Sequence, residues 1–547
     1  MTSNRREFLH AAAAGVACAT ALRPAANDGL IEVLVDEPIA AIAPEIYGHF
    51  VENLGGVVYD GIWVGEDSPI PNIGGLRKSL VDALRRISPP VIRWPGGCFA
   101  DSYDWRDGIG PRAKRPRRTN FWAGGEWPKG ARRAGPQSYD PNQFGTIEFT
   151  RFCKATGAQP YFAANLRGSS AQDFDRWVEY CNSPAGTTSL ADQRAADGER
   201  DALNVRYWGV GNEAWGCGGS FTPEDYATEF LRYTSWVPGF NVPLAFVGSG
   251  PNGNDADWTR RFFAKVSQKG ELGRLWGWSM HHYAWNASGG RTSDWVAGKG
   301  DALQFGAEQY YEILREANQM DSFINHQWTV MAETDPRHHV KLVVDEWGAW
   351  YAPGTEPFTE ALLGQQSTMR DAVLAGITLD TFNRNAEKVG MAAVAQLVNC
   401  LQSLFFAHED RFCVTPTYHV FDMYRAHQGA QSLRAVVSAR PIAYARDKGT
   451  GSLAGLSCSA SLRDKTLTLT VTNPSLDQTH EVEISLRGAN AASGKALTLA
   501  AADAHAHNSF ENPHAVEPHA EPWQAAGGRA TRRFPPASVT KLEMLLA

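Results

Sequence analysis

Short apolar runs that end in polar or glycine residues recur between residues 40 and 400, and segments of helical character separate them. Alternation of strands with helices is typical of a parallel sheet covered by helices. Eight runs occur, which is the number that a closed (β/α)8 TIM barrel requires. The predicted strands are 45–50, 90–94, 160–165, 205–210, 244–248, 277–281, 341–345 and 392–397.

The pattern changes to alternation with a period of two after about residue 430. Residues 466–472 and 481–486 alternate apolar with polar side chains, and Asn473-Pro474 marks a turn. A further strand is expected at 538–546, and 30–35 has the same character. The sequence therefore predicts the (β/α)8 barrel over 41–429 and a jelly-roll-like β-sandwich over 430–547. Residues 27–40 are expected to add an N-terminal strand to the sandwich.

Composition describes an ordinary globular protein with many aromatic side chains. The 547 residues exceed the usual size of one core, which agrees with two domains. A formal net charge of −7 gives no electrostatic basis for binding nucleic acid. The 18 Trp, 16 Tyr and 25 Phe suit the apolar faces of sugars, although a large core also uses aromatic residues.

The N-terminus has the order of a twin-arginine signal peptide. Arg5-Arg6 precedes an apolar stretch over 11–22 and small residues that end near Ala26. We therefore expect residues 1–26 to direct export to the periplasm or the extracellular space, with lipidation at Cys18 as an alternative. No later stretch approaches the length of a membrane span. The remaining cysteines contain no C-x-x-C pair, so neither a disulfide framework nor a zinc site is expected.

Two glutamates follow apolar runs at positions that suit catalysis. Glu213 ends the fourth predicted strand after Asn212, and Glu346 ends the seventh. Catalytic groups of a TIM barrel gather at the carboxyl ends of its strands. Two carboxylates that converge there can cleave a glycosidic bond, one as acid and one as nucleophile, and a spacing of roughly 5 Å gives retention. Arg93, at the end of the second strand, can keep a nearby carboxylate ionised. The alternative is that each glutamate only pairs with a base in a structural network.

Other motifs fail on inspection. Residues 209–214 fit a degenerate dinucleotide fingerprint, but the next helix start signal is at Thr222, where Pro223 and two acids follow. His281 and His282 are adjacent, so their side chains point to opposite faces of a strand and do not suggest one metal site. We therefore expect neither a cofactor nor a metal.

Several segments in order resemble glycoside hydrolase family 51. They are Ile46-Tyr-Gly-His-Phe-Val-Glu-Asn-Leu-Gly55, Met280-His-His-Tyr283, Ala395-Gln-Leu-Val-Asn399 and Phe510-Glu-Asn-Pro513. The resemblance covers essentially the whole chain after the signal segment. It implies a retaining α-L-arabinofuranosidase built as a barrel with a C-terminal β-sandwich, acting on an arabinose-containing oligo- or polysaccharide. It also implies that the chain forms a homo-oligomer, as relatives commonly do.

The resemblance assigns roles residue by residue. Glu213 corresponds to the acid/base, Glu346 to the nucleophile, and Asn212 to the amide at the sugar 2-hydroxyl. The other implied sugar-contacting or neighbouring positions are Glu52, His281, Tyr283, Trp350 and Gln396, with Trp122 as a candidate for the aromatic wall.

The chain departs from the family at Cys98, where relatives often have Asn. A thiol is a poorer hydrogen-bond partner than an amide, which puts this substrate contact in doubt. Residues 114–135 are expected to form an entry loop. The alternatives are an endo-glucanase or xylan-active enzyme of the same family, and a sugar-binding protein without catalysis. The presence of both carboxylates argues against the second alternative.

Overall fold

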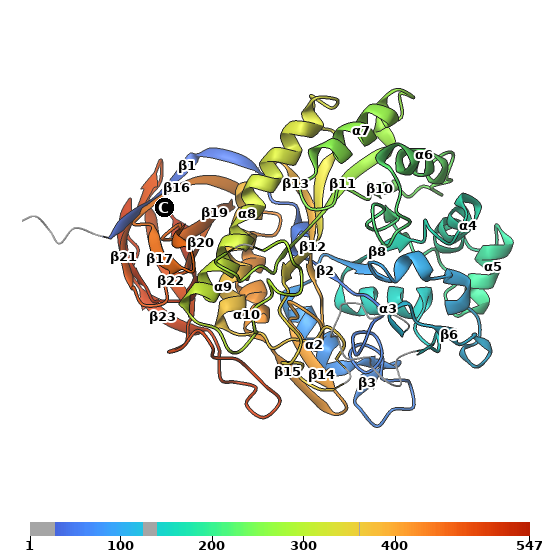
Figure 1. Ribbon diagram of the computed structural model, residues 1–547, viewed down its shortest axis with the longest axis horizontal. Helices are drawn as coiled ribbons and strands as arrows, with labels where there is room; N and C mark the ends of the chain where they lie inside the picture. Colours follow the sequence, from blue (N-terminus) through green and yellow to red (C-terminus); the bar gives the residue numbers. More distant parts are fainter. Residues whose placement is uncertain (1–27, 124–138, 291, 360) are drawn as a thin grey trace, which may run out of the picture.

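The computed structural model describes residues 28–123, 139–290, 292–359 and 361–547. The predicted signal segment 1–26, Cys18 and the part of the expected entry loop from residue 124 onward lie outside this range. Two bodies are visible: a barrel ringed by helices and a curved, strand-rich unit that carries the C-terminus (Figure 1). Among the described residues, no helix is both long and apolar enough to cross a membrane.

Eight parallel strands close the barrel in the order β10-β11-β12-β13-β2-β5-β8-β9. All eight predicted strands are present, so the predicted TIM barrel is confirmed. The strands are β2 (Gly48–Phe50), β5 (Val91–Trp94), β8 (Gln159–Ala164), β9 (Tyr207–Val210), β10 (Ala245–Gly248), β11 (Leu275–Ala284), β12 (Lys341–Ala349) and β13 (Val389–Ala395).

The strand boundaries differ from prediction in two informative ways. The first predicted strand begins with a 3-10 turn, Pro44–Tyr47, because Pro44 has no N–H to donate to a sheet ladder. Strands β11 and β12 continue past the predicted ends, to Ala284 and Ala349. Glu346 therefore lies within β12, on ordered strand backbone, rather than in a loop after it.

Helices cover the barrel. They are α2 (Lys78–Ile87), α3 (Thr146–Thr156), α4 (Ala171–Asn182), α5 (Ser189–Ala196), α6 (Pro223–Tyr233), α7 (Ala256–Ser267), α8 (Ala307–Ala332), α9 (Met369–Arg384) and α10 (Pro416–Tyr424). Helix α6 begins where the sequence predicts, since the Thr222 side chain accepts a hydrogen bond from the Asp225 N–H and Pro223 takes the first position.

The C-terminal residues form a nine-stranded sheet with the order β23-β22-β25-β20-β19-β16-β1-β21-β24. Strand β1 pairs antiparallel with β16 and parallel with β21, so a segment that precedes the barrel in the sequence is built into this sheet. The strands are β1 (Gly29–Ala41), β16 (Gln431–Ala439), β19 (Ser457–Arg463), β20 (Thr466–Asn473), β21 (His480–Arg487), β22 (Ala491–Leu499), β23 (His519–Trp523), β24 (Arg529–Phe534) and β25 (Ser538–Leu546).

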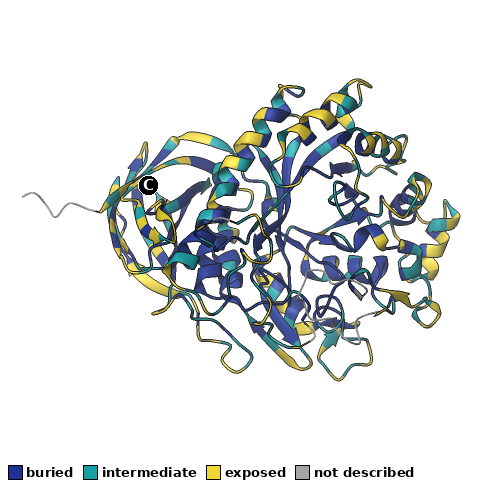
Figure 2. Ribbon diagram, in the orientation of Figure 1, coloured by how far each residue is buried: buried dark blue, intermediate teal, exposed yellow. Residues whose placement is uncertain are grey.

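Helix α9 joins the two bodies. Residues 369–383 are all buried, because the helix packs between the barrel and strands β19, β20 and β25 (Figure 2). The buried carboxylate of Asp380 accepts hydrogen bonds from Tyr424, Ser459 and Thr470 at 3.0, 2.8 and 2.7 Å. Burial raises the pKa of Asp380 to about 6 despite these bonds. Helix α9 therefore contacts the strand-rich unit through buried hydrogen bonds as well as through apolar packing.

Candidate active site

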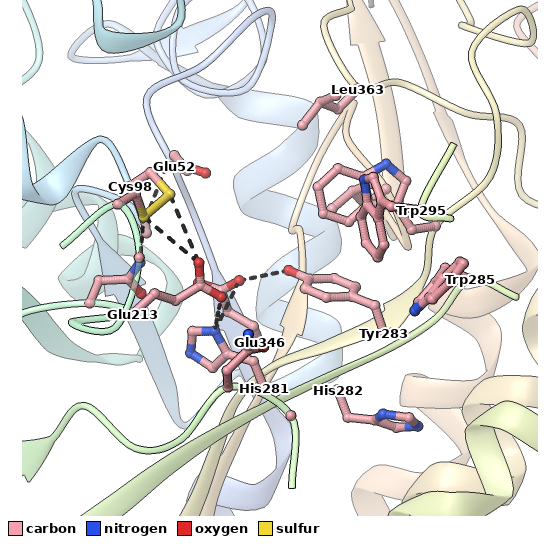
Figure 3. Close-up of a pocket in the computed structure, with 18 of the residues that line it drawn as sticks. Glu52, Cys98, Glu213, His281, His282, Tyr283, Trp285, Trp295, Glu346 and Leu363 are labelled. Carbon is pink, nitrogen blue, oxygen red and sulfur yellow. Dashed lines mark hydrogen bonds and ion pairs between the residues drawn. A yellow bond between two sulfur atoms is a disulfide. The ribbon is translucent and has the colours of Figure 1, made fainter. Parts of the chain in front are cut away.

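Glu213 and Glu346 meet at the carboxyl ends of the barrel strands. Glu213 follows β9, and Glu346 lies in β12. Carboxylate oxygens of the two residues lie within 4.8 Å of each other and of a ring nitrogen of His281. Retaining glycosidases place their two carboxyl groups about 5–5.5 Å apart, whereas inverting enzymes need about 6.5–9.5 Å. Figure 3 shows the two carboxylates close together, with the His281 ring beside them.

Arg93 and Tyr283 each hydrogen-bond one oxygen of the Glu346 carboxylate. Arg93 donates from Nη1 to Oε1 at 2.8 Å, and the Tyr283 hydroxyl donates to Oε2 at 2.8 Å. The other arm of Arg93 donates to Asn212 Oδ1 at 2.6 Å, and its Nε lies 3.3 Å from the Asp345 carboxylate. Burial lowers the pKa of Arg93, but the charges of Asp345 and Glu346 outweigh it and raise that pKa overall. A permanent positive charge therefore lies directly against Glu346.

Gly97 makes this close packing possible. A Cβ atom at this position would lie 2.8 Å from Glu346 Oε1 and 3.4 Å from Asn212 Nδ2. Glu213 itself has a φ of 40°, in the left-handed region that non-glycine residues rarely adopt. Strained backbone of this kind concentrates at functional sites, where the surrounding structure enforces it.

His281 links three carboxylates. Its Nδ1 lies 3.0 Å from Glu213 Oε1 and 3.5 Å from Glu346 Oε2, and its Nε2 lies 3.4 Å from Asp345 Oδ1. Burial lowers the pKa of His281, but the surrounding Glu346, Asp345 and Glu213 raise it to about 10. The ring is therefore an imidazolium at neutral pH, and it donates a hydrogen bond to Glu213.

This raised pKa predicts a stability change with pH. The unfolded histidine has a pKa near 6.5 and the folded one near 10, so the folded protein binds the extra proton between these values. The contribution of His281 is fully present below pH 6.5 and is lost as the pH rises through about 10. We expect urea unfolding to show a steeper loss of stability over this window in the wild type than in His281→Gln. An equal slope in both proteins would contradict this, and the exposed His326→Gln should match the wild type.

Glu52 lines the same pocket, in contact with Gln396. Its Oε1 accepts hydrogen bonds from the backbone N–H groups of Gly97 and Phe99 at 3.2 and 2.9 Å. Gln396 accepts from the Glu52 N–H at 2.9 Å and donates weakly to Oε2 at 3.4 Å. Burial, and then the charge of Glu346, raise the pKa of Glu52 to about 8. Glu52 is therefore predominantly a neutral acid below pH 8.

A neutral Glu52 predicts that its amide variant is mild. At pH 6 we expect Glu52→Gln to lose less than about tenfold in kcat/KM, because it preserves a neutral polar group, whereas Glu52→Ala loses about 100-fold. Initial rates with an aryl arabinofuranoside measure both losses. A loss in Glu52→Gln as large as that in Glu52→Ala at pH 6 would show that the ionised form is required.

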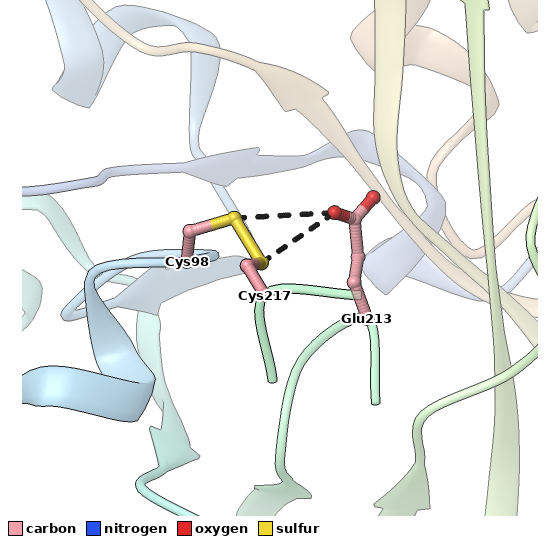
Figure 4. Close-up of side chains that lie close together, drawn as sticks. All are labelled: Cys98, Glu213 and Cys217. Atoms are coloured by element: carbon pink, nitrogen blue, oxygen red, sulfur yellow. Dashed lines mark hydrogen bonds between the residues drawn. A yellow bond between two sulfur atoms is a disulfide. The ribbon is translucent and has the colours of Figure 1, made fainter. Parts of the chain in front are cut away.

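The cysteines overturn one prediction. Cys98 and Cys217 form a disulfide with a Cα–Cα distance of 5.5 Å, whereas the sequence predicted no disulfide framework. The residues are 119 apart along the chain and share no C-x-x-C spacing, so only the meeting of the loops after β5 and β9 reveals the pair. Cys98 therefore has no thiol hydrogen to donate. Its sulfur and that of Cys217 lie 4.0 and 3.7 Å from Glu213 Oε2 (Figure 4).

The carboxylates open into a cavity of about 690 Å³. Nine of the ten predicted site residues line the cavity. The tenth, Arg93, does not line it but donates hydrogen bonds to Glu346 and Asn212, which do. Trp350 packs edge-on against Tyr283 at 5.2 Å, and Lys299 lies over the rings of Trp350 and Trp295. The aromatic lining consists of Phe121, Trp122, Trp215, Tyr283, Trp285, Trp295, Phe323 and Trp350.

The sequence reasoning missed several of these residues. The Asp345 carboxylate contacts both Arg93 and His281. The sequence signal that could have identified Asp345 was an acidic residue inside an otherwise apolar strand. Cys217, Trp285 and Trp295 carried no local signal. His282 turns away from Glu213 and contacts the backbone oxygen of Glu316 in α8 at 2.7 Å, as expected for adjacent histidines on a strand. Within the described residues, Glu213, His281 and Glu346 have a spacing that permits a metal ion, although a protonated histidine disfavours one.

Comparison with known proteins agrees with this geometry. The family models described as "Alpha-L-arabinofuranosidase 1 domain" and "Alpha-L-arabinofuranosidase C-terminal domain" match residues 83–237 and 345–538. An intracellular exo-alpha-L-arabinofuranosidase of Bacteroides ovatus is 34% identical over 95% of this chain and 96% of its own length.

Solved structures agree over the same extent. The GH51 arabinofuranosidase from Xanthomonas axonopodis pv. citri is 34% identical with a TM-score of 0.85, over 94% of this chain and all of its own. An arabinose complex of the Thermotoga maritima α-L-arabinofuranosidase is 27% identical with a TM-score of 0.79, over the same shares. With its barrel, its paired carboxylates and these relatives, the chain belongs to glycoside hydrolase family 51, the α-L-arabinofuranosidase family.

Proposed function

We propose that this protein is a retaining α-L-arabinofuranosidase that removes terminal non-reducing arabinofuranosyl residues from arabinan- or arabinoxylan-type glycans. The observation that carries the proposal is the separation of the Glu213 and Glu346 carboxylates, which is within 4.8 Å for one oxygen of each and agrees with the shorter spacing of retaining enzymes. The arabinose complex of the Thermotoga maritima relative supports the choice of sugar.

The first half-reaction uses both carboxylates. Glu346 attacks the anomeric carbon while Glu213 gives its proton to the departing glycosidic oxygen, so the bond to the leaving group breaks as the ester to Glu346 forms. Arg93 and Tyr283 fix the Glu346 carboxylate in place through one hydrogen bond to each oxygen. This positioning lowers the entropic cost of reaching the transition state.

The second half-reaction releases the sugar. Glu213, now ionised, takes a proton from a water that attacks the anomeric carbon, and Glu346 leaves as a carboxylate. Two inversions give net retention. His281 donates to Glu213 and so orients the carboxylate toward the reacting oxygen. Glu52 and Asn212 line the pocket beside Glu346, where they suit the sugar hydroxyls.

The test is hydrolysis of 4-nitrophenyl α-L-arabinofuranoside beside the glucopyranoside and xylopyranoside analogues. Selective turnover of the arabinofuranoside, with the α-anomer as first product by NMR, is expected. Preference for a pyranoside would favour the glucanase or xylan-active alternative. The likeness of this chain to a glucanase-xylanase and to a xyloglucanase, at 14 and 13% identity, is evidence about the fold and not about the substrate. Release of single arabinose units from arabinan tests the exo mode, and sedimentation tests the expected homo-oligomer.

Export by the twin-arginine route is a second part of the proposal. It rests on Arg5-Arg6 and the segment after them, and the Cys98–Cys217 disulfide supports it because disulfides persist in oxidising compartments. The Bacteroides ovatus relative is described as intracellular. Fractionation of cells that express the full chain tests this point. The activity should move from the periplasm to the cytoplasm when both arginines become lysine, and an unchanged distribution would refute the route.

A further inference from the structure

The Cys98–Cys217 disulfide lies against the carboxylate of Glu213 and opens to solvent through the active-site cavity. Both cysteines and Glu213 are partly exposed, and all three line the cavity. The remaining cysteines of the described chain, Cys153, Cys181, Cys400, Cys413 and Cys458, are buried. A small reductant or a metal ion that enters the cavity therefore meets this pair of sulfurs first.

The three side chains have the spacing of a metal site. One ligand atom from each of Cys98, Cys217 and Glu213 lies within 4.8 Å of the other two. In a tetrahedral zinc site, with Zn–S near 2.3 Å and Zn–O near 2.1 Å, a sulfur and an oxygen ligand are about 3.6 Å apart. The Glu213 Oε2 atom already lies 3.7 and 4.0 Å from the two sulfurs. To complete this geometry the two sulfurs have to separate to about 3.8 Å, and the Cys98 sulfur has to move slightly closer to Oε2.

We propose that the reduced enzyme binds Zn²⁺ through the thiolates of Cys98 and Cys217 and the carboxylate of Glu213, with water in the fourth position. Disulfide and metal exclude each other, because a disulfide sulfur has no thiolate charge to offer. A dithiol opens the bond by two exchange steps and leaves as its own disulfide, while the two cysteine sulfurs gain its protons. Zinc then displaces those two protons.

Metal binding has a direct effect on the reaction. A Glu213 carboxylate that coordinates zinc can neither protonate the leaving oxygen nor activate water, so the reduced, zinc-loaded enzyme is inactive. This consequence rests on the proposed role of Glu213, whereas the binding itself does not. The disulfide then protects the acid/base residue from thiophilic metals.

The first experiment measures binding without an activity assay. The whole enzyme is reduced with a dithiol, desalted under anaerobic conditions, and checked by thiol titration for two thiols more than the oxidised enzyme. Cobalt(II) added to this protein should give a thiolate-to-cobalt charge-transfer absorption at one equivalent, and zinc should abolish it. The oxidised enzyme and Cys217→Ser should not show the absorption, whereas Cys413→Ser, which changes a buried free cysteine, should behave as the reduced wild type. Absence of the absorption in reduced wild type overturns the site.

The second experiment measures the consequence. Zinc is expected to reduce the arabinofuranosidase rate of the reduced enzyme by more than about tenfold, with recovery on addition of EDTA, and to leave the oxidised enzyme unaffected. Each protein is compared with its own zinc-free rate. Equal inhibition of the oxidised enzyme would show that zinc inhibits without the two thiolates, and would overturn the proposed effect on the reaction. A cobalt spectrum in a protein that lacks arabinofuranosidase activity would refute the proposed function and leave the metal site standing.

Discussion

Glu346→Ala is expected to lower kcat on an aryl arabinofuranoside by on the order of 10⁵-fold, because it removes the group that we propose forms the covalent bond. The substitution also leaves Arg93 and Tyr283 without the carboxylate that they hold. Steady-state rates with 4-nitrophenyl α-L-arabinofuranoside measure the loss. Circular dichroism and thermal unfolding show whether the barrel is intact.

Azide provides the diagnostic readout for Glu346→Ala. A small anion that occupies the space of the lost carboxylate attacks the anomeric carbon directly, so the rate recovers and the product is the inverted β-arabinofuranosyl azide. The surface variant Glu333→Ala, which lies on the outside of the barrel beside Arg260, is the matched control and should keep wild-type activity. Rescue with retained configuration would assign the nucleophile to another residue.

Glu213→Ala has the second-largest expected effect, and the effect depends on the leaving group. General acid catalysis contributes about 10²–10⁴-fold, so substrates with poor leaving groups should lose rate by that factor. A dinitrophenyl arabinofuranoside needs no proton to depart, and its first step should be nearly unaffected. Pre-steady-state kinetics should then show a burst of phenol followed by slow turnover, because water attack still lacks its base.

Azide again separates the roles. With Glu213→Ala the anion attacks the covalent intermediate, so the product is the retained α-arabinofuranosyl azide, opposite to the product of Glu346→Ala. An equal loss for good and poor leaving groups would contradict the assignment of Glu213 as acid/base. Glu333→Ala serves as the same control.

Much of the fold was predictable because its signals are local. The eight barrel strands appear as apolar runs between helical segments, and the cap at Thr222 sets the start of α6. Alternation with a period of two located β20, β21 and β25 within a residue or so. The full length of β11 and β12 was not predictable. Polar residues near the end of a strand, such as the histidines of β11 and the glutamate of β12, resemble the start of a loop.

The positions of the site residues were predictable where these residues lie at the carboxyl end of a barrel strand. Glu213 and Glu346 converge because all strands of a closed parallel barrel end on the same rim. The chain of contacts from Asp345 through His281 to Glu213 was not predictable, because its members come from different strands and loops. The pKa of His281, raised to about 10, and that of Glu52, raised to about 8, arise from these neighbours and from burial.

The sequence by itself determined the number and the chain positions of the barrel strands and the family, and it singled out the two carboxylates as candidates, since periodicity, caps and motifs are read along the chain. The tertiary structure alone decided which distant groups touch. Barrel closure brings Cys98 to Cys217 across 119 residues, and it places Arg93 between Glu346 and Asn212. Such contacts depend on register and curvature summed over the whole barrel, which no local pattern encodes.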